Sequence, residues 1–102
     1  MADRDDVCVL IPTYNEAATI GDVVESFVTA GFDDVLVIDG GSDDGTQTLA
    51  TDAGARVVEQ SGTGEGSGKG QAVREALDRY VDRPYVLMLD GDATYRPDEA
   101  ER

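Results

Sequence analysis

Four short apolar segments alternate with longer amphipathic stretches along the chain. The apolar segments are residues Val7–Ile11, Val35–Ile38, Arg56–Glu59 and Tyr85–Leu89. Short runs of aliphatic and β-branched residues without polar alternation are typical of strands covered on both faces of a parallel sheet. The pattern predicts four strands: the third, with only two valines between charged residues, at an edge, and the fourth buried.

The stretches between these strands have the spacing of amphipathic helices. From Ile20 the apolar residues recur at positions 23, 24, 27 and 28, and polar residues take the opposite face. Asn15 is predicted to cap this helix and Gly31 to end it. A second helix is predicted to run to Ala53 and to close at Gly54. A third helix, before Pro84, has an apolar face made of Val73, Ala76, Leu77 and Tyr80.

Strands that alternate with helices at this spacing are joined by right-handed crossovers and form a parallel sheet. The predicted fold class is therefore α/β, a three-layer, Rossmann-like parallel sheet with flanking helices. In such sheets ligands bind beyond the carboxyl ends of the strands, near the point where the strand order reverses. Loops 12–16, 39–46, 62–70 and 90–92 all follow predicted strand ends, so we expect them to share one rim.

Length and charge limit what the chain binds. Its 102 residues, 40% of them hydrophobic, fit one small domain with one core. With 22 acidic and eight basic residues, the net charge of −14 makes nucleic acid or an anionic membrane surface an unfavourable partner. A phosphate ligand must then be bound locally. An acidic surface with Lys69 as the only lysine is what we expect of a protein from a salt-rich cytoplasm, where salt screens self-repulsion.

Cys8 is the only cysteine and lies within an apolar segment. It has no intrachain disulfide partner, so we expect it to act as a small buried hydrophobe. No stretch approaches the roughly 18 consecutive apolar residues of a membrane span, and the acidic N-terminus lacks the features of a signal peptide. The expected location is cytoplasmic, and a membrane-peripheral position is open for a longer enzyme that contains this chain.

Two carboxylates one residue apart follow the fourth apolar segment. Asp90 and Asp92 flank Gly91 where a strand is predicted to end, and Thr94 comes two residues later. Hard cations such as Mg²⁺ prefer oxygen ligands and keep substrate phosphates as partners, so this pair is a candidate metal site. The same spacing also occurs at residues 3–5, and a solvated acidic turn is the alternative interpretation.

Four motifs in chain order resemble one enzyme family. They are Ile11-Pro12-Thr13-Tyr14-Asn15-Glu16, Ile38-Asp39-Gly40-Gly41-Ser42-Asp43-Asp44-Gly45-Thr46, Gly68-Lys69-Gly70 and Leu89-Asp90-Gly91-Asp92. Together they resemble the inverting family 2 glycosyltransferases of the GT-A fold over nearly the whole chain. Gly68-Lys69-Gly70, followed by Ala72 and Arg74, together with Asp90-Gly91-Asp92 and Pro97, is most similar to the polyprenyl-phosphate sugar synthases of the dolichyl-phosphate mannose or glucose type.

The resemblance implies a nucleotide-sugar donor whose nucleoside lies against the first two loops. Pro12 would fix the exit of the first strand so that Tyr14 offers its ring and hydroxyl. Glu16 and Asp39 would accept hydrogen bonds from the ribose or the base. Their alternatives are a first-turn acid favoured by the helix dipole and a turn-forming aspartate. The family usually has two acids at the end of the second strand, whereas Gly40 follows Asp39 here. If the second acid makes the base contact, that contact is missing, so the identity of the nucleotide stays open.

Lys69 and Arg74 are the basic residues of the third motif. In the resemblance, Lys69 lies in a glycine-rich phosphate cradle, where backbone approaches phosphates closely and an ammonium neutralises them. The spacing differs from a P-loop because Gly70 follows the lysine where Ser or Thr is required. A flexible linker is the alternative. Arg74 either joins Lys69 or pairs with Asp78 at the i,i+4 spacing.

The same resemblance implies a divalent metal, Mg²⁺ or Mn²⁺. Asp92 would ligate it, Asp90 and Gly91 would lie nearer the ribose or a metal-bound water, and Thr94 could add a ligand. The metal would neutralise charge that develops on the departing nucleoside diphosphate. The anomeric carbon is then open to in-line attack from the opposite face, which inverts its configuration.

The family supplies a general base from a segment later than the metal motif, beyond Arg102. A polyprenyl phosphate acceptor is already an oxyanion and needs little deprotonation. Residues 1–102 are therefore expected to form a single partial GT-A domain, the nucleotide-sugar-binding half of an enzyme, without the acceptor half and itself inactive in transfer. The alternatives are a truncated, non-catalytic nucleotide-binding module and an aspartyl-phosphate phosphatase, whose D-x-D-x-T motif is spelled by Asp90 to Thr94.

Overall fold

A computed structural model describes residues 6–60 and 68–88, with side chains for 6–60 and 74–88. Strands and helices alternate throughout these ranges, as the apolar pattern predicts. The elements are β1 (Val7–Thr13), α1 (Ile20–Thr29), β2 (Val35–Asp39), α2 (Thr46–Ala53), β3 (Arg56–Glu59), α3 (Gly68–Arg79) and β4 (Tyr85–Met88). No helix in the described ranges is long and apolar enough to cross a membrane.

The four described strands form one parallel sheet in the order β3-β2-β1-β4. From β1 the chain moves outward through β2 to β3 and then returns to the other side of β1 for β4. The strand order therefore reverses beside β1, where parallel sheets bind their ligands. Thr13 and Asp39 are partners in the register of β1 and β2, so the carboxyl ends of these strands are level with each other.

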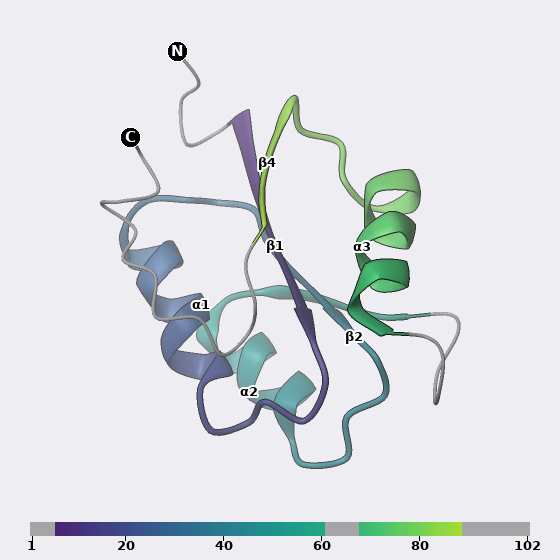
Figure 1. Ribbon diagram of the computed structural model, residues 1–102. Helices are drawn as coiled ribbons and strands as arrows, with labels where there is room; N and C mark the ends of the chain where they lie inside the picture. The colour runs from purple at the N-terminus through teal and green to yellow at the C-terminus, as the bar shows by residue number, and fades with distance from the viewer. Residues whose placement is uncertain (1–5, 61–67, 89–102) are drawn as a thin grey trace.

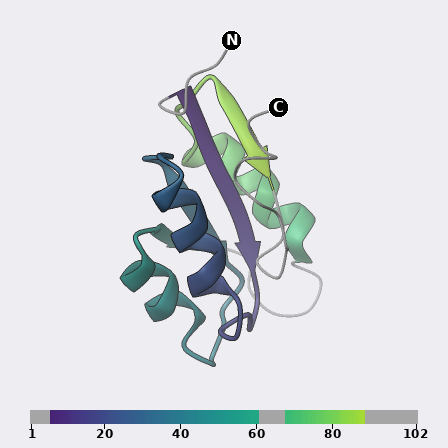
Figure 2. The same ribbon diagram turned by 90° about the vertical axis from the view of Figure 1, so that its left-hand side faces the viewer.

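Helices cover both faces of the sheet, which gives the predicted three layers. Helices α1 and α2 lie on one face and α3 on the other (Figures 1 and 2). Alternate strand residues supply the two cores. Val9, Ile11, Val35 and Val37 pack with α1 and α2, and Cys8, Leu10, Leu36 and Ile38 pack on the side of Ala76 of α3. In the first core, the rings of Phe27 and Phe32 meet edge to face, with centroids 5.6 Å apart.

Cys8 is fully buried, as expected of a small hydrophobe. Burial, together with the nearby charge of Asp34, raises the pKa of its thiol to about 12. The thiol is therefore neutral at physiological pH and packs as an apolar side chain.

Strand β1 continues two residues beyond its predicted end, through Pro12 and Thr13. Val9 donates its backbone N–H to Asp34 O, and Thr13 accepts from Gly40 N, so alternate residues of β1 face β2. Pro12 falls between them and faces β4, whose described pairing ends one step earlier, at Leu10 with Met88. The missing N–H of Pro12 therefore removes no hydrogen bond to β2, so the proline is compatible with a place inside the strand.

Glycines end the first two helices as predicted, but Asn15 does not cap α1. The N-cap of α1 is Thr19, and no side chain makes a capping hydrogen bond there. Asn15 lies earlier in the loop, in a left-handed conformation with φ 52°, and its side chain contacts the loop after β2 instead. Gly31, with φ 100°, and Gly54, with φ 114°, follow α1 and α2 in the left-handed conformation that favours glycine.

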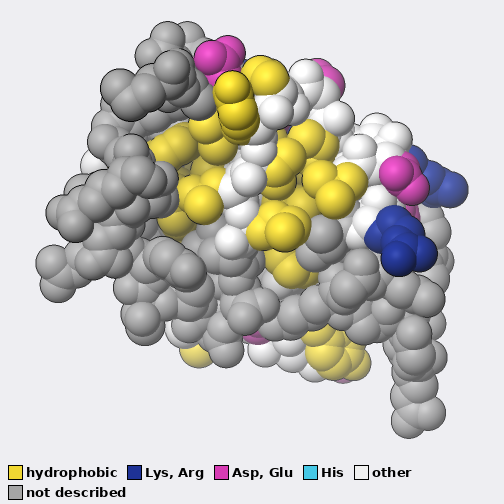
Figure 3. Space-filling model, turned by 45° about the horizontal axis from the view of Figure 1, so that its top comes forward, with side chains coloured by type: hydrophobic (Ala, Val, Ile, Leu, Met, Phe, Trp, Pro, Cys, Tyr) yellow, Lys and Arg dark blue, Asp and Glu magenta, His cyan; other side chains and the backbone are white. Residues whose placement is uncertain are grey.

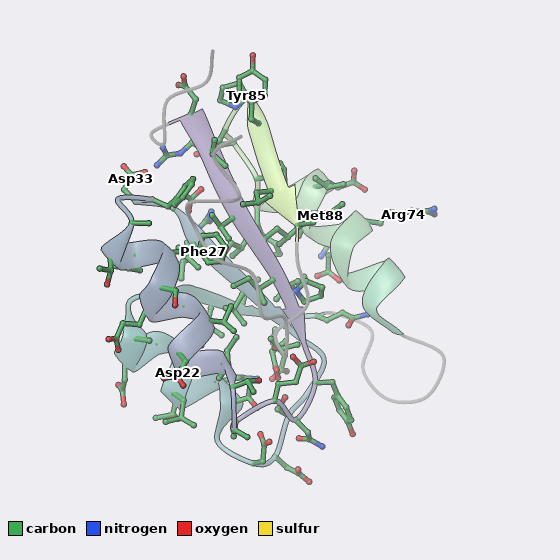
Figure 4. All side chains as sticks on the ribbon, turned by 60° about the vertical axis from the view of Figure 1, so that its left-hand side comes forward. Asp22, Phe27, Asp33, Arg74, Tyr85 and Met88 are labelled. Atoms are coloured by element: carbon green, nitrogen blue, oxygen red, sulfur yellow. The ribbon has the colours of Figure 1, made fainter. Side chains whose placement is uncertain are left out.

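Among the described strands β3 lies at an edge of the sheet, as predicted, whereas the prediction that β4 is buried is wrong, because its residues are exposed or only half-buried. Among the described strands β4 pairs only with β1. Tyr85 and Met88, at its two ends, are 55% and 52% exposed. Figure 4 shows their side chains at the two ends of β4. Figure 3 shows hydrophobic side chains gathered on the face that is seen when the top of the molecule in Figure 1 comes forward. An apolar run alone does not distinguish a central strand from an edge strand with one open side.

Ion pairs tie together the amino ends of the strands, opposite the predicted rim. Arg56 of β3 and Arg83, which precedes β4, both pair with Asp34, at 3.3 and 3.6 Å. Arg56 also donates a 3.0 Å hydrogen bond to Tyr80 O beyond α3. These contacts join both edges of the sheet and α3 at one end and leave the carboxyl ends of the strands to the loops.

Candidate functional site

The loops that follow β1 and β2 are joined by hydrogen bonds at the carboxyl ends of the strands. Thr13 Oγ1 donates to Asp39 Oδ1 at 2.7 Å, and Gly40 N donates to Thr13 O at 2.9 Å. One step further out, Asn15 N donates to Ser42 Oγ at 2.7 Å, and Asp43 N donates to Asn15 Oδ1 at 3.0 Å. The two loops predicted to share a rim therefore form one unit.

Asp39 is at the centre of this unit and is fully buried. Its Oδ1 accepts from Thr13 Oγ1 and from Ser42 Oγ, the latter at 2.6 Å. Its Oδ2 accepts from Gly41 N at 3.0 Å, from Ser42 N at 2.7 Å and from Gln47 Nε2 at 2.8 Å. Five donors from β1, the loop and α2 thus converge on one carboxylate.

These donors keep Asp39 ionised. Burial alone would raise the pKa of Asp39, but the hydrogen bonds from Ser42, Thr13 and Gln47 outweigh burial and hold the pKa below its ordinary value. A direct contact between Asp39 and a base or ribose, as predicted from the sequence, would require one of the five donors to leave.

Asp44 joins the start of α2 to the first loop. Thr46 donates to Asp44 Oδ1 through its hydroxyl and, at 3.1 Å, through its backbone N–H. Ala17 N donates to Asp44 Oδ2 at 3.1 Å, and Glu16 N donates to Thr46 Oγ1 at 2.9 Å. The hydrogen bond from Thr46 lowers the pKa of Asp44 more than its slight desolvation raises it. Asp44 therefore holds Glu16 and Ala17 against the helix.

Tyr14 projects from this scaffold and is 55% exposed. Its ring lies beside Gly40, where an added Cβ would be 3.6 Å from Tyr14 Cδ1 and 3.4 Å from Gln60 Oε1. An added methyl group at position 40 would thus be in ordinary van der Waals contact with the Tyr14 ring and the buried amide of Gln60. The Tyr14 ring therefore lies directly above the start of the loop that follows β2.

The chain matches the model of glycosyl transferase family 2 over residues 8–102. It belongs to glycosyltransferase family 2. Glycosyltransferase AglJ of Haloferax volcanii is 60% identical over 102 residues, which are all of this chain and 32% of that protein. A dolichyl-phosphate hexose transferase from the same organism is 44% identical over 93 residues, 89% of this chain and 38% of that protein.

Solved structures confirm the fold predicted for this family 2 chain. Glucosyl-3-phosphoglycerate synthase from Mycobacterium tuberculosis, in complex with Mn²⁺, UDP-glucose and phosphoglyceric acid, is 30% identical, with a TM-score of 0.82. The match covers 95% of this chain and 37% of that one. The chain thus spans about a third of the length of the proteins that it matches.

The structure brings together part of the predicted site. Pro12, Tyr14, Glu16 and Asp39 all lie at or just beyond the carboxyl ends of β1 and β2. Lys69 lies in the first turn of α3, and its side chain is outside the described residues. Arg74 is exposed and points away from the sheet (Figure 4). The remaining predicted residues, Asp90, Gly91, Asp92 and Thr94, lie outside the described residues, and within the described ranges no three potential ligands cluster as a metal site would require.

Several residues that build the rim were missed by sequence reasoning. Thr13, Ser42, Gln47 and Thr46 supply or relay its hydrogen bonds. One signal was available: a hydroxyl at the end of β1 opposite an aspartate at the end of β2, which an aligned pair of parallel strands places side by side. The contact of Gln47 has no such signal because it depends on how α2 packs.

Proposed function

We propose that this family 2 chain is the nucleotide-binding half of a glycosyltransferase. The enzyme transfers a sugar, with inversion, from a nucleoside-diphosphate donor to a polyprenyl phosphate. The observation that carries this proposal is the hydrogen-bonded rim at the carboxyl ends of β1 and β2, with Tyr14 exposed beside Gly40. It lies where the strand order reverses, the usual ligand site of an open parallel sheet.

The nucleoside lies against the first loop in this proposal. Tyr14 offers an aromatic face for the base and a hydroxyl, and aromatic rings stack on every base. Glu16, held by Thr46 through its backbone N–H, accepts from a ribose hydroxyl. Pro12 and Asp39 lie beneath this loop, where β1 and β2 end.

The diphosphate extends from the nucleoside toward β4. Lys69 binds the phosphates from the first turn of α3. The positive N-terminal end of that helix also favours the negative charge of the phosphates. Asp92, with Asp90, Gly91 and Thr94 beside it, follows β4 in the sequence and would hold Mg²⁺ or Mn²⁺. Bound there, the ion supplies charge neutralisation for the leaving diphosphate. The Mn²⁺ complex of the M. tuberculosis relative supports this choice of ions.

The acceptor is proposed to be a lipid phosphate because a close relative is a dolichyl-phosphate hexose transferase. A phosphate oxygen attacks the anomeric carbon, and the bond from that carbon to the diphosphate oxygen breaks. Its electron pair leaves with the nucleoside diphosphate, and the anomeric configuration inverts. Residues that bind the acceptor, and any general base, would belong to segments that the longer relatives have and these 102 residues do not. A lipid acceptor would place the whole enzyme beside a membrane.

Calorimetry with nucleoside-diphosphate sugars, with and without Mn²⁺, tests donor binding. The wild-type chain is expected to bind at least one of UDP-glucose and GDP-mannose, more tightly with Mn²⁺. Tyr14→Ala should weaken binding by about 1–3 kcal/mol, the usual contribution of a stacked aromatic ring.

Tyr85→Ala is the matched control, since Tyr85 is equally exposed but starts β4 at the opposite end of the sheet. Equal losses for the two tyrosines, or no binding by the wild type, would refute the donor site.

A transfer assay distinguishes the enzyme from a non-catalytic module. The module is the alternative because the chain spans only 32% of the length of a relative. We expect the purified chain to bind donor without transferring sugar to a polyprenyl phosphate. A longer protein that contains the chain should transfer it. Donor binding without transfer by that longer protein would favour the module.

A further inference from the structure

Asp39 is so completely enclosed that it has no lone pair to offer a ligand. A carboxylate has about four lone-pair positions. Five donors already occupy the two oxygens of Asp39, at 2.6 to 3.0 Å. The residue is also fully shielded from solvent. A ligand could reach it only by displacing one of the donors that hold the loops together.

The contacts of Asp39 hold Tyr14 from both sides. Thr13, which precedes Tyr14, donates its hydroxyl directly to Asp39. Asn15, which follows Tyr14, donates its backbone N–H to Ser42 Oγ, and that same hydroxyl donates to Asp39. The residues on either side of the exposed ring are thus fastened to one buried carboxylate, directly and through one hydroxyl.

We propose that Asp39 is a positioning residue that sets the Tyr14 ring for the nucleoside and does not itself contact the base or ribose. This inference rests on the proposed function, in which the nucleoside lies against Tyr14. It assigns Asp39 a role different from the direct contact that the sequence predicts.

Thr13→Val distinguishes the two roles because they predict opposite results. The substitution removes one donor and keeps the size of the side chain. If Asp39 binds the ligand directly, an oxygen freed in this way should leave nucleotide affinity unchanged or improve it. If Asp39 acts by position, the loosened Tyr14 should bind the nucleoside diphosphate about five- to tenfold more weakly, which is within the usual contribution of one hydrogen bond. Thr48→Val, an exposed hydroxyl on α2, is the matched control and should bind as the wild type does.

A double-mutant cycle tests whether the effect passes through Tyr14. In the Tyr14→Ala background, Thr13→Val should change the affinity for UDP or GDP with Mn²⁺ by less than about twofold, because the ring that Thr13 helps to position is absent. An undiminished loss in that background would overturn the proposal.

Asp39→Asn should preserve the hydrogen bonds that position Tyr14, whereas Asp39→Ala removes them. An amide can direct its oxygen at Gly41, Ser42 and Gln47 and its NH₂ at the hydroxyls of Thr13 and Ser42, which can turn to accept. We expect Asp39→Asn to keep affinity within about threefold and Asp39→Ala to lose it by more than about tenfold, with folding of each variant checked by circular dichroism. Tighter or unchanged binding by Thr13→Val, alongside a wild type that binds, would overturn this inference alone. A wild type that binds no nucleotide would overturn the proposed function as well.

Discussion

At the scale of single residues, the buried carboxylate of Asp39 organises the rim. Three of its hydrogen-bond partners lie at different distances along the sequence: Thr13 is 26 positions away, Ser42 three and Gln47 eight. Buried carboxylates are stable only when such donors compensate for lost water. Because the folded chain lowers the pKa of Asp39, its contribution to stability depends on pH.

The sign of this dependence follows from the direction of the shift. A pKa lower in the folded than in the unfolded chain gives a stabilisation that is complete above about pH 4 and lost as the pH falls through the folded value. We expect Asp39→Asn to reduce the free energy of unfolding at pH 7 by about 1–3 kcal/mol. It should also flatten the decline of this free energy below pH 4, measured by urea denaturation.

Asp52→Asn, at an exposed position of α2, is the control and should retain the decline seen in the wild type. Part of the decline should persist in Asp39→Asn because Asp44 also has a lowered pKa. A decline identical in wild type and Asp39→Asn would show that the Asp39 contacts do not form in solution.

The sequence identified Asp39 as a site residue but not what it does. An aspartate followed by glycines at a strand end is compatible with a ligand contact and with a loop-forming role. The choice depends on donors brought from β1 and α2, and such tertiary contacts leave no local pattern. Asn15 shows the same limit, since a cap and a loop contact both suit a residue that tolerates a left-handed backbone.

At the scale of elements, the local pattern predicts where strands and helices form, but it does not predict which elements pack beside one another. Apolar segments predicted every described strand, and β1 extends further only because its proline faces away from β2. Whether β4 is covered depends on which elements pack beside it, so the apolar run of Tyr85–Leu89 misled the prediction. Glycine positions at helix ends were predictable because a left-handed residue there has few substitutes.

Two glycines, one inside α1 and one at the end of α2, test this account of helix ends. Gly21 lies within α1, and a Cβ there would meet nothing within 4 Å, so Gly21→Ala should stabilise the chain by about 0.5–1 kcal/mol. Gly54 has φ 114°, and a Cβ there would lie 3.3 Å from Val28 Cγ2. Gly54→Ala should therefore destabilise the chain by about 1–2 kcal/mol.

Thermal denaturation of both variants gives the two signs in one experiment. Equal effects of alanine at the two positions would contradict the helix end at Ala53.

At the scale of the whole molecule, the two ends of the sheet differ in kind. At the amino ends of the strands, Arg56 and Arg83 form ion pairs with Asp34. At the carboxyl ends, uncharged N–H and O–H groups donate hydrogen bonds to the carboxylate of Asp39. The chain as a whole carries a net charge of −14. A diphosphate must approach this rim against the overall field, which makes Lys69 and a divalent cation important to the proposed donor site.

Self-repulsion should make the fold depend on salt. We expect the midpoint of thermal unfolding to rise by several degrees or more between low salt and molar KCl, because screening weakens repulsion among 22 acidic residues. Sucrose, which is excluded from the surface but screens no charge, should produce a smaller rise at equal osmolality. Full stability without added salt would exclude the salt-rich origin expected from the composition.

The central claim is that separate segments of this family 2 chain meet around one nucleoside diphosphate. A crystal structure of the chain with UDP or GDP and Mn²⁺ tests it most directly. We predict the base against Tyr14, the phosphates between Lys69 and the metal, and the metal on Asp92, with Asp39 still bound to its five donors. A nucleotide bound elsewhere, or Lys69 and Asp92 on opposite sides of the molecule, would contradict this claim.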